Sequence, residues 1–303
     1  MAAADRPPLA GFAIVIVAAS LFGTLGPLSR LAYDAGMQPT PFVAWRGAIG
    51  FIAAAVFVAW RISRGSEHLT RLADLDTSAR LSLAATALSG FLLNVCMFVA
   101  FDLVTVALAL LCLYTYPVIV AVANVGLGRE SMDRPRAIAL TLAVLGMVAV
   151  VASEIDPASG VRVDALGIAL ALAAAGFQAL FVIVSRSGYP GVPASQAMSL
   201  VLVTTLVGST LLAIGVGNVD GLTYPLRDPA VLPILVFTGL FAAAIPSIMF
   251  VTGIRLVGGT RAGILMLFEP VVGVVLAALL LGEGLTSIQV VGGVAILAAA
   301  LIL

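Results

Sequence analysis

Residues 262–281 read AGILMLFEPVVGVVLAALLL, an apolar stretch of 20 residues that contains a single charged side chain, Glu269. An α-helix rises ~1.5 Å per residue, so a helix of this length crosses the ~30 Å hydrocarbon core of a bilayer. Similar stretches recur along the whole chain. The sequence predicts ten membrane-spanning helices, near residues 12–32, 42–60, 82–101, 105–126, 136–153, 165–186, 195–216, 231–252, 262–281 and 286–303.

The composition agrees with this pattern. Of the 303 residues, 62% are hydrophobic and 10% are charged, whereas soluble proteins carry about 25% charged residues. The sequence therefore predicts an all-α integral membrane protein and excludes a soluble enzyme. The 15 basic residues, all arginine, balance 15 acidic residues, so the chain lacks the basic surface of a nucleic-acid-binding protein. Because it has two cysteines in apolar stretches and one histidine in a loop, we expect no cofactor and no metal site.

Arginine residues lie mainly in alternate loops. If the N-terminus is cytoplasmic, the cytoplasmic loops contain eleven arginines, and the loops on the other side contain only Arg30, Arg162 and Arg227. Cytoplasmic loops of membrane proteins are enriched in Lys and Arg. We therefore expect both the N-terminus and the C-terminus to lie in the cytoplasm.

The two halves of the chain, residues 1–153 and 154–303, resemble each other. At a shift of 153 residues Pro117 aligns with Pro270, and at a shift of 156 residues Ser29-Arg30 aligns with Ser185-Arg186. Each half contains five predicted spans, an odd number, so the second half must enter the membrane from the opposite side. The sequence thus predicts two inverted five-helix repeats, an architecture with which transporters place a substrate site near the bilayer midplane. The alternative is a duplication that is retained only for packing.

Several short motifs resemble those of the drug/metabolite transporter superfamily, and specifically its ten-helix EamA-type exporters. They are Leu21-Phe22-Gly23-Thr24, Arg46 after Pro41, Glu269-Pro270, Leu281-Gly282-Glu283, and the weaker copies Tyr116-Pro117 and Leu127-Gly128-Arg129-Glu130. Length and pattern are similar to the aromatic amino-acid exporter branch. The resemblance implies a secondary transporter in the bacterial inner membrane that exports amino acids, such as phenylalanine or methionine, or related metabolites by alternating access.

Polar and aromatic residues near the centres of the spans predict where a solute would bind. Positions that the repeat relates should converge on one cavity near the midplane, because polar groups at that depth are costly unless they face protein or water. These mirrored pairs are Phe22 with Gln178, Asn94 with Ser247, and Tyr116 with Glu269. The predicted substrate-binding residues are Phe22, Asn94, Phe98, Tyr114, Tyr116, Gln178, Phe181, Ser247 and Glu269. The alternative is that Asn94, Gln178 and Ser247 only join helices to one another.

Two charged residues and two prolines have further predicted roles. Glu269 could bind a substrate ammonium, carry a coupling proton, or accept structural hydrogen bonds. Arg46 could extend its side chain to the interface, form an ion-paired gate, or bind a substrate carboxylate. Pro117 and Pro270 should bend their helices, because proline removes a backbone hydrogen bond and clashes with the carbonyl one turn earlier. We assign Arg46, Pro117 and Pro270 to gating or to the helix interfaces.

The expected partners are a small-molecule substrate and the lipid bilayer, with protons as an open candidate for a coupling ion. The protein is expected to be a monomer or a weak homo-oligomer. A flippase for lipids or lipid-linked sugars, of the same superfamily, is the alternative function. An intramembrane enzyme is less favoured, because such enzymes need paired acids, a metal site or an activated nucleophile at one depth, and the spans contain one deep acid.

Overall fold

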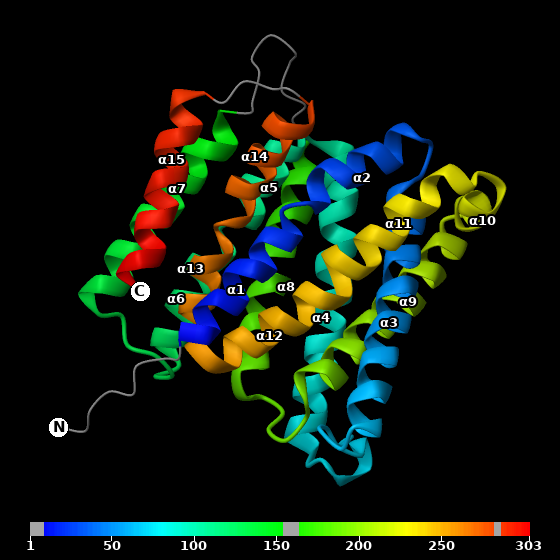
Figure 1. Ribbon diagram of the computed structural model, residues 1–303, viewed down its shortest axis with the longest axis horizontal. Coiled ribbons are helices and arrows are strands. Elements are labelled where there is room, and N and C mark those ends of the chain that lie inside the picture. Colours follow the sequence, from blue (N-terminus) through cyan, green and yellow to red (C-terminus); the bar gives the residue numbers. More distant parts are fainter. Residues whose placement is uncertain (1–8, 154–163, 282–285) are drawn as a thin grey trace.

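The computed structural model describes residues 9–153, 164–281 and 286–303, and every regular element within these ranges is helical (Figure 1). The helices of the first half are α1 (Leu9–Phe22), α2 (Leu25–Asp34), α3 (Pro39–Ser63), α4 (Thr77–Leu103), α5 (Val106–Leu113), α6 (Tyr116–Gly126) and α7 (Arg134–Ala152). The later helices are α8 (Ala165–Ser187), α9 (Ala194–Gly215), α10 (Val219–Arg227), α11 (Leu232–Gly239), α12 (Ile245–Val257), α13 (Gly259–Met266), α14 (Glu269–Leu281) and α15 (Ser287–Ile302). Short helical turns lie at Leu72–Asp74, Pro229–Val231 and Leu240–Ala244.

In the described part of the chain, eight helical segments are long and apolar enough to cross a membrane. They are Leu9–Asp34, Pro39–Ser63, Thr77–Leu103, Leu108–Gly126, Arg134–Ala152, Ala165–Ser187, Ala194–Gly215 and Pro229–Val257. The two remaining predicted spans coincide with α13 and α14, which are separate helices, and with α15, which has 16 residues. The chain is therefore an all-helical, multi-pass membrane protein.

Prolines account for the interruptions within spans. Proline has no N–H, so the carbonyl four residues earlier loses its helical donor. Counting back four residues from Pro117 and from Pro270 reaches Leu113 and Met266, which are the last residues of α5 and α13. The same count from Pro246 reaches Ala242, within the π-helical turn Leu240–Ala244. The predicted bends at Pro117 and Pro270 are thus confirmed as helix breaks.

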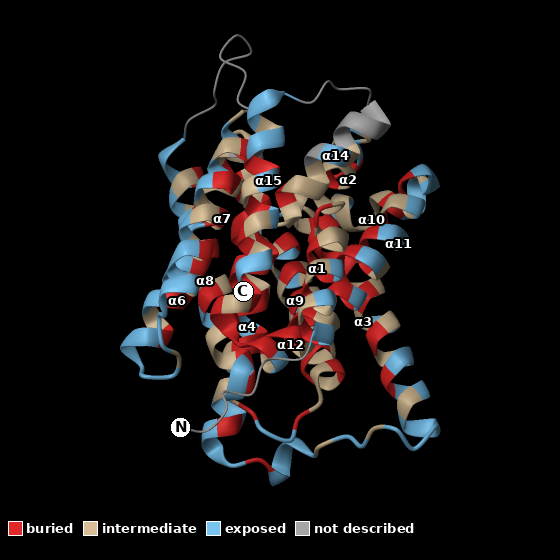
Figure 2. Ribbon diagram, turned by 60° about the vertical axis from the view of Figure 1, so that its left-hand side comes forward, coloured by how far each residue is buried: buried red, intermediate tan, exposed pale blue. Residues whose placement is uncertain are grey.

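The bundle is held together by helix pairs that approach closely at small residues. Pairs that lie against each other include α7 with α15, α3 with α9, α4 with α8, and α1 with α12; the first two pairs form opposite edges of the bundle (Figure 1). A methyl group added at Gly11 of α1 would lie 2.6 Å from Val257 Cγ1, and one at Gly167 of α8 would lie 2.7 Å from Val104 Cγ1. Buried residues occupy the interior of the bundle, and exposed residues cover its ends (Figure 2).

The close backbone approach of α7 and α15 gives a stability prediction. A Cβ atom at Gly146 of α7 would lie 2.6 Å from the carbonyl oxygen of Gly292 of α15, so Gly146→Ala must push the two helices apart. We expect it to lower the free energy of unfolding by about 1–3 kcal/mol, the usual cost of overpacking. Gly176→Ala is the matched control, because Gly176 of α8 has no atom within 4 Å of the added methyl. Thermal unfolding in detergent gives the melting temperature of each variant. Equal melting temperatures of Gly146→Ala and Gly176→Ala would contradict the prediction.

Candidate functional site

Arg46 is a buried charged residue at the centre of the candidate site. It lies seven residues after the first residue of α3, about 10 Å along the helix axis, and its exposed fraction is 7%. Its Nη1 atom donates a hydrogen bond to Asn94 Oδ1 of α4 at 3.0 Å, and its guanidinium lies over the ring of Phe98, 5.5 Å from the centroid. Asn94 is itself held in place, since its Nδ2 donates to the carbonyl of Gly90 at 2.7 Å.

The π-helical turn explains the third contact of Arg46. Its Nη2 atom donates to the carbonyl oxygen of Ala242 at 3.1 Å. Pro246 cannot supply the helical donor to that oxygen, so the arginine side chain replaces the missing backbone N–H. Arg46 therefore joins three helical segments, α3, α4 and the turn before α12, through groups that carry no charge of their own.

Glu269 contributes the opposite charge. It is the first residue of α14 and is half-buried, directly after the break between α13 and α14. Its carboxyl group interacts with the hydroxyl of Tyr114 through a hydrogen bond and with Arg46 through longer-range electrostatics. Tyr116 is buried, and its hydroxyl interacts with the Gln178 side chain and, through longer-range electrostatics, with Glu269. Five of the predicted site residues, Asn94, Tyr114, Tyr116, Gln178 and Glu269, thus interact with Arg46 or with one another, and Phe98 packs on its guanidinium.

Other predicted residues lie outside these direct contacts. Phe22 is half-buried at the end of α1 and packs against the main hydrophobic core. Ser247 is half-buried on α12. Phe181 of α8 stacks on Phe250 of α12, with ring centroids 6.4 Å apart and an interplanar angle of 10°, and both rings are buried. Phe181 therefore belongs to an aromatic contact between α8 and α12, outside the hydrogen bonds and the ring contact of Arg46.

The structure adds Tyr33 to the site, a residue that the sequence did not single out. Its ring packs edge-on against Phe42, whose ring packs on Phe98. Its hydroxyl is buried without a hydrogen-bond partner and interacts electrostatically with Arg46. Tyr33 stands near the end of the first predicted span, where a tyrosine is typical of the membrane interface. Because a tyrosine at this position is expected in any membrane protein, the sequence gives no signal that Tyr33 contacts the interior of the bundle.

Two arginines form hydrogen bonds between the segments of α8 and α12. They lie where both helices end, at the lower end of the bundle in Figure 1. Arg186 Nη1 donates to the carbonyl oxygens of Ile254, at 2.9 Å, and of Arg255. In return, Arg255 Nη1 donates to the carbonyl of Val192 at 2.7 Å, and its guanidinium lies over the ring of Tyr189. The last carbonyls of a helix lack intrahelical donors, so Arg186 supplies donors to the end of α12, whereas Arg255 supplies one to the loop that follows α8. We call this exchange the Arg186–Arg255 clasp.

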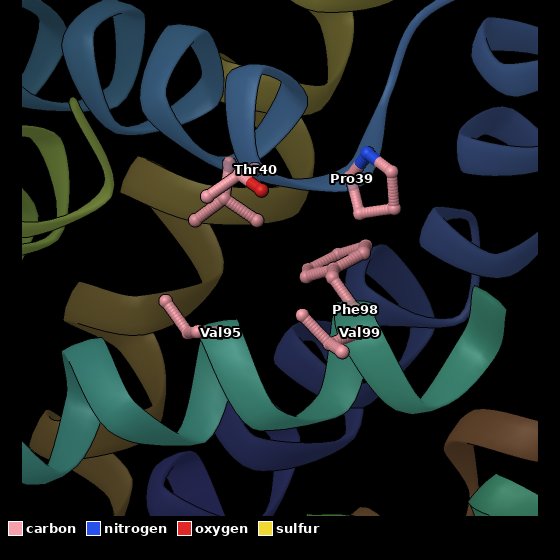
Figure 3. A pocket seen from close by; sticks show the side chains of 6 residues that line it. Pro39, Thr40, Val95, Phe98 and Val99 are labelled. Atoms are coloured by element: carbon pink, nitrogen blue, oxygen red, sulfur yellow. The ribbon is translucent and has the colours of Figure 1, made fainter. Parts of the chain in front are cut away.

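A small apolar pocket lies between the start of α3 and α4 (Figure 3). Its lining is Pro39, Thr40, Val43, Val95, Phe98 and Val99, and its empty volume is ≈ 140 Å³. Much of this space is open to solvent and does not enclose room for a water molecule, so the pocket is too small to hold a solute of amino-acid size. Phe98 separates it from the Arg46 guanidinium.

In the described ranges, no group of three or more His, Cys, Asp or Glu residues could hold a metal ion.

Comparisons with known proteins identify the family. No curated protein matches the chain. A solved crystal structure resembles it with a TM-score of 0.75 and 17% sequence identity, covering 97% of this chain and 95% of that one, which shows a shared fold. The model of the EamA-like transporter family matches residues 9–152 and again residues 165–303. The two matches span nearly the whole length, and the chain belongs to the EamA-like transporter family, whose members move small molecules across membranes.

Proposed function

We propose that this protein is a secondary transporter that exports amino acids, aromatic or otherwise apolar ones such as phenylalanine and methionine, or related metabolites, by alternating access. The observation that carries the proposal is the polar site around Arg46 and Glu269 inside an otherwise apolar bundle. Charged groups at this depth are costly and mark substrate or ion pathways in membrane proteins. Aromatic rings beside opposite charges suit a solute that is apolar at one end and zwitterionic at the other.

We also propose that the two halves are inverted repeats that together form ten spans. The family model matches each half separately. The packing supports the same relation, because Gly11 meets Val257 in the way that Gly167 meets Val104, at the two shifts that align the halves. Inverted repeats allow two conformations of similar energy, in which the halves exchange their arrangements and the central site changes the side to which it opens.

The orientation that we propose places the Arg186–Arg255 clasp at the cytoplasmic face, with both termini on that side and the protein in the cell inner membrane. The loops at the clasp end contain most of the arginines, as the positive-inside rule requires. Phe181 and Phe250, whose rings stack, each precede the clasp arginine of their helix by five residues, about 7 Å along the helix axis. In the proposed orientation, the clasp and these rings close the cytoplasmic end, and export requires this end to open.

Reconstitution into liposomes tests the proposed function. Liposomes that contain the purified protein should take up labelled phenylalanine or methionine down a gradient at least tenfold faster than protein-free liposomes. A second set of liposomes should be monitored for transfer of labelled lipids between leaflets, because a flippase of the same superfamily would give activity there instead. The absence of flux for a broad panel of amino acids would contradict the proposal.

A further inference from the structure

The charge on Arg46 has no anionic partner in direct contact. In the described part of the chain, ion pairs within 4.0 Å join Arg61 with Glu67, Arg136 with Asp133, and Arg227 with Asp220, and all involve groups near the ends of the bundle. The groups that touch the Arg46 guanidinium are the Asn94 amide oxygen, the Ala242 carbonyl and the ring of Phe98, all of them neutral. A buried charge is normally paired, because burial removes the water that would stabilise it.

Two buried hydrogen-bond donors of this region also lack an acceptor: one belongs to the Arg46 guanidinium itself, and the other lies within electrostatic range of it. Nε of Arg46 is buried and has no hydrogen-bond partner among the described residues, and the same is true of the Tyr33 hydroxyl. The two groups interact electrostatically, and the packing of Tyr33 on Phe42 and of Phe42 on Phe98 connects them through one aromatic cluster. Buried polar atoms of proteins rarely lack partners. The arrangement therefore lacks one group that is negatively charged and accepts at least two hydrogen bonds.

A carboxylate has these properties. It carries one negative charge, its two oxygens only accept hydrogen bonds, and it pairs with a guanidinium more strongly than a neutral acceptor does. Glu269 does not fill this position, because it acts on Arg46 only beyond ion-pair distance and is hydrogen-bonded to Tyr114. Asp102 does not fill it either, because its side chain is exposed and it acts on Tyr33 only through longer-range electrostatics. It remains available for a cationic group at the other end of the same solute.

We propose that Arg46 and Tyr33 together bind the carboxylate of the transported solute, through Nε of the guanidinium and the tyrosine hydroxyl. This inference rests on the proposed function, and it narrows the substrate class to solutes with a free carboxylate. Asn94 and the Ala242 carbonyl are then positioning groups, which fix the plane of the guanidinium so that its Nε edge faces the solute. Phe98 covers one face of the guanidinium and shields the pair from water.

Equilibrium binding to the purified protein in detergent tests the assignment separately from transport. The probes are L-phenylalanine, 3-phenylpropionate, phenylalaninamide and 2-phenylethylamine, of which the first two carry a carboxylate and the last two do not. We expect the two acids to bind at least tenfold more tightly than the amide and the amine. Equal affinities for all four solutes would overturn the proposal even if liposome flux is present. Carboxylate-selective binding without flux would instead overturn the proposed function.

Tyr33→Phe tests the second donor, since it removes only the hydroxyl. We expect the affinity ratio of phenylalanine to phenylalaninamide to fall by a factor of about ten or more, the lower end of what one hydrogen bond to a charged group contributes. Tyr224→Phe is the matched control, because the Tyr224 hydroxyl donates to the Ala35 carbonyl at the outer end of the bundle; its ratio should equal that of the wild type. A purely structural role of Tyr33 would lower stability without changing the ratio, and an unchanged ratio would overturn the proposal.

Discussion

Cross-linking α8 to α12 at the end that we propose to be cytoplasmic is expected to reduce transport to the background of protein-free liposomes. The pair Phe181→Cys and Phe250→Cys replaces two rings whose centroids are 6.4 Å apart, within reach of a short bifunctional thiol reagent. In the proposed cycle these residues must separate, together with the Arg186–Arg255 clasp, before a solute can enter from the cytoplasm. A covalent link across them holds that entrance closed, so the effect should exceed that of any change that only weakens binding.

The native thiols Cys96 and Cys112 are replaced by alanine in every variant of this experiment, since both could react. Each single-cysteine variant, treated with the same reagent, serves as the control and should retain its flux. A reagent that contains a disulfide allows the link to be cut, and flux should then return. Full flux in the cross-linked protein would show that α8 and α12 do not separate at this end during transport.

Glu269→Gln is expected to lower flux at least tenfold. Glutamine has nearly the same shape as glutamate and can still accept a hydrogen bond from Tyr114, so the substitution removes mainly the charge. The charge interacts with Arg46 through longer-range electrostatics, and in the proposed function it also pairs with the ammonium group of an amino acid. Asp220→Asn makes the same chemical change in an exposed ion pair with Arg227 and should leave flux unchanged, since exposed pairs contribute little.

The same variant distinguishes the three roles that the sequence left open for Glu269. If the carboxyl carries a coupling proton, the wild type responds to a proton gradient and Glu269→Gln does not. If it binds the ammonium group, the variant loses phenylalanine binding but keeps that of 3-phenylpropionate. A structural role predicts a lower melting temperature with the substrate preference intact. Normal flux and normal stability together would contradict all three roles.

Apolar stretches were sufficient to predict the eight long apolar helical segments of the described ranges, because length and hydropathy are local properties of the chain. The short helix α10 lies in a predicted loop and was not predicted. The break between α13 and α14 was likewise expected from Pro270. The π-helical turn was not predicted, since the sequence around Pro246 does not indicate how the helix redistributes its hydrogen bonds.

The contacts of the site depend on tertiary structure and were only partly predictable. The sequence indicated that Asn94 and Glu269 belong to the interior, because polar groups stand out in apolar spans. For Arg46 it left open an extension of the side chain to the membrane interface, and the burial of that side chain contradicts this alternative. The bond from Arg46 to the Ala242 carbonyl could not be foreseen, as a backbone atom carries no signal in the sequence. Arg186 and Arg255 were counted only as loop charges that set the orientation. Their exchange of hydrogen bonds emerges when the ends of α8 and α12 come together.

The central claim is that one interior site becomes accessible from each side of the membrane in turn. Ser247→Cys provides a probe for it, because Ser247 is half-buried on α12 and lies further into the membrane than Phe250. The test is labelling of this thiol by a membrane-impermeant reagent, in right-side-out and in inverted vesicles, in a protein without Cys96 and Cys112. Ser131→Cys and Asp220→Cys mark the two faces, since both residues are exposed at opposite ends of the bundle.

The account predicts that Ser131→Cys is labelled only from the cytoplasmic side, Asp220→Cys only from the other side, and Ser247→Cys from both. Labelling of Ser247→Cys from one side only, or from neither side, would contradict it.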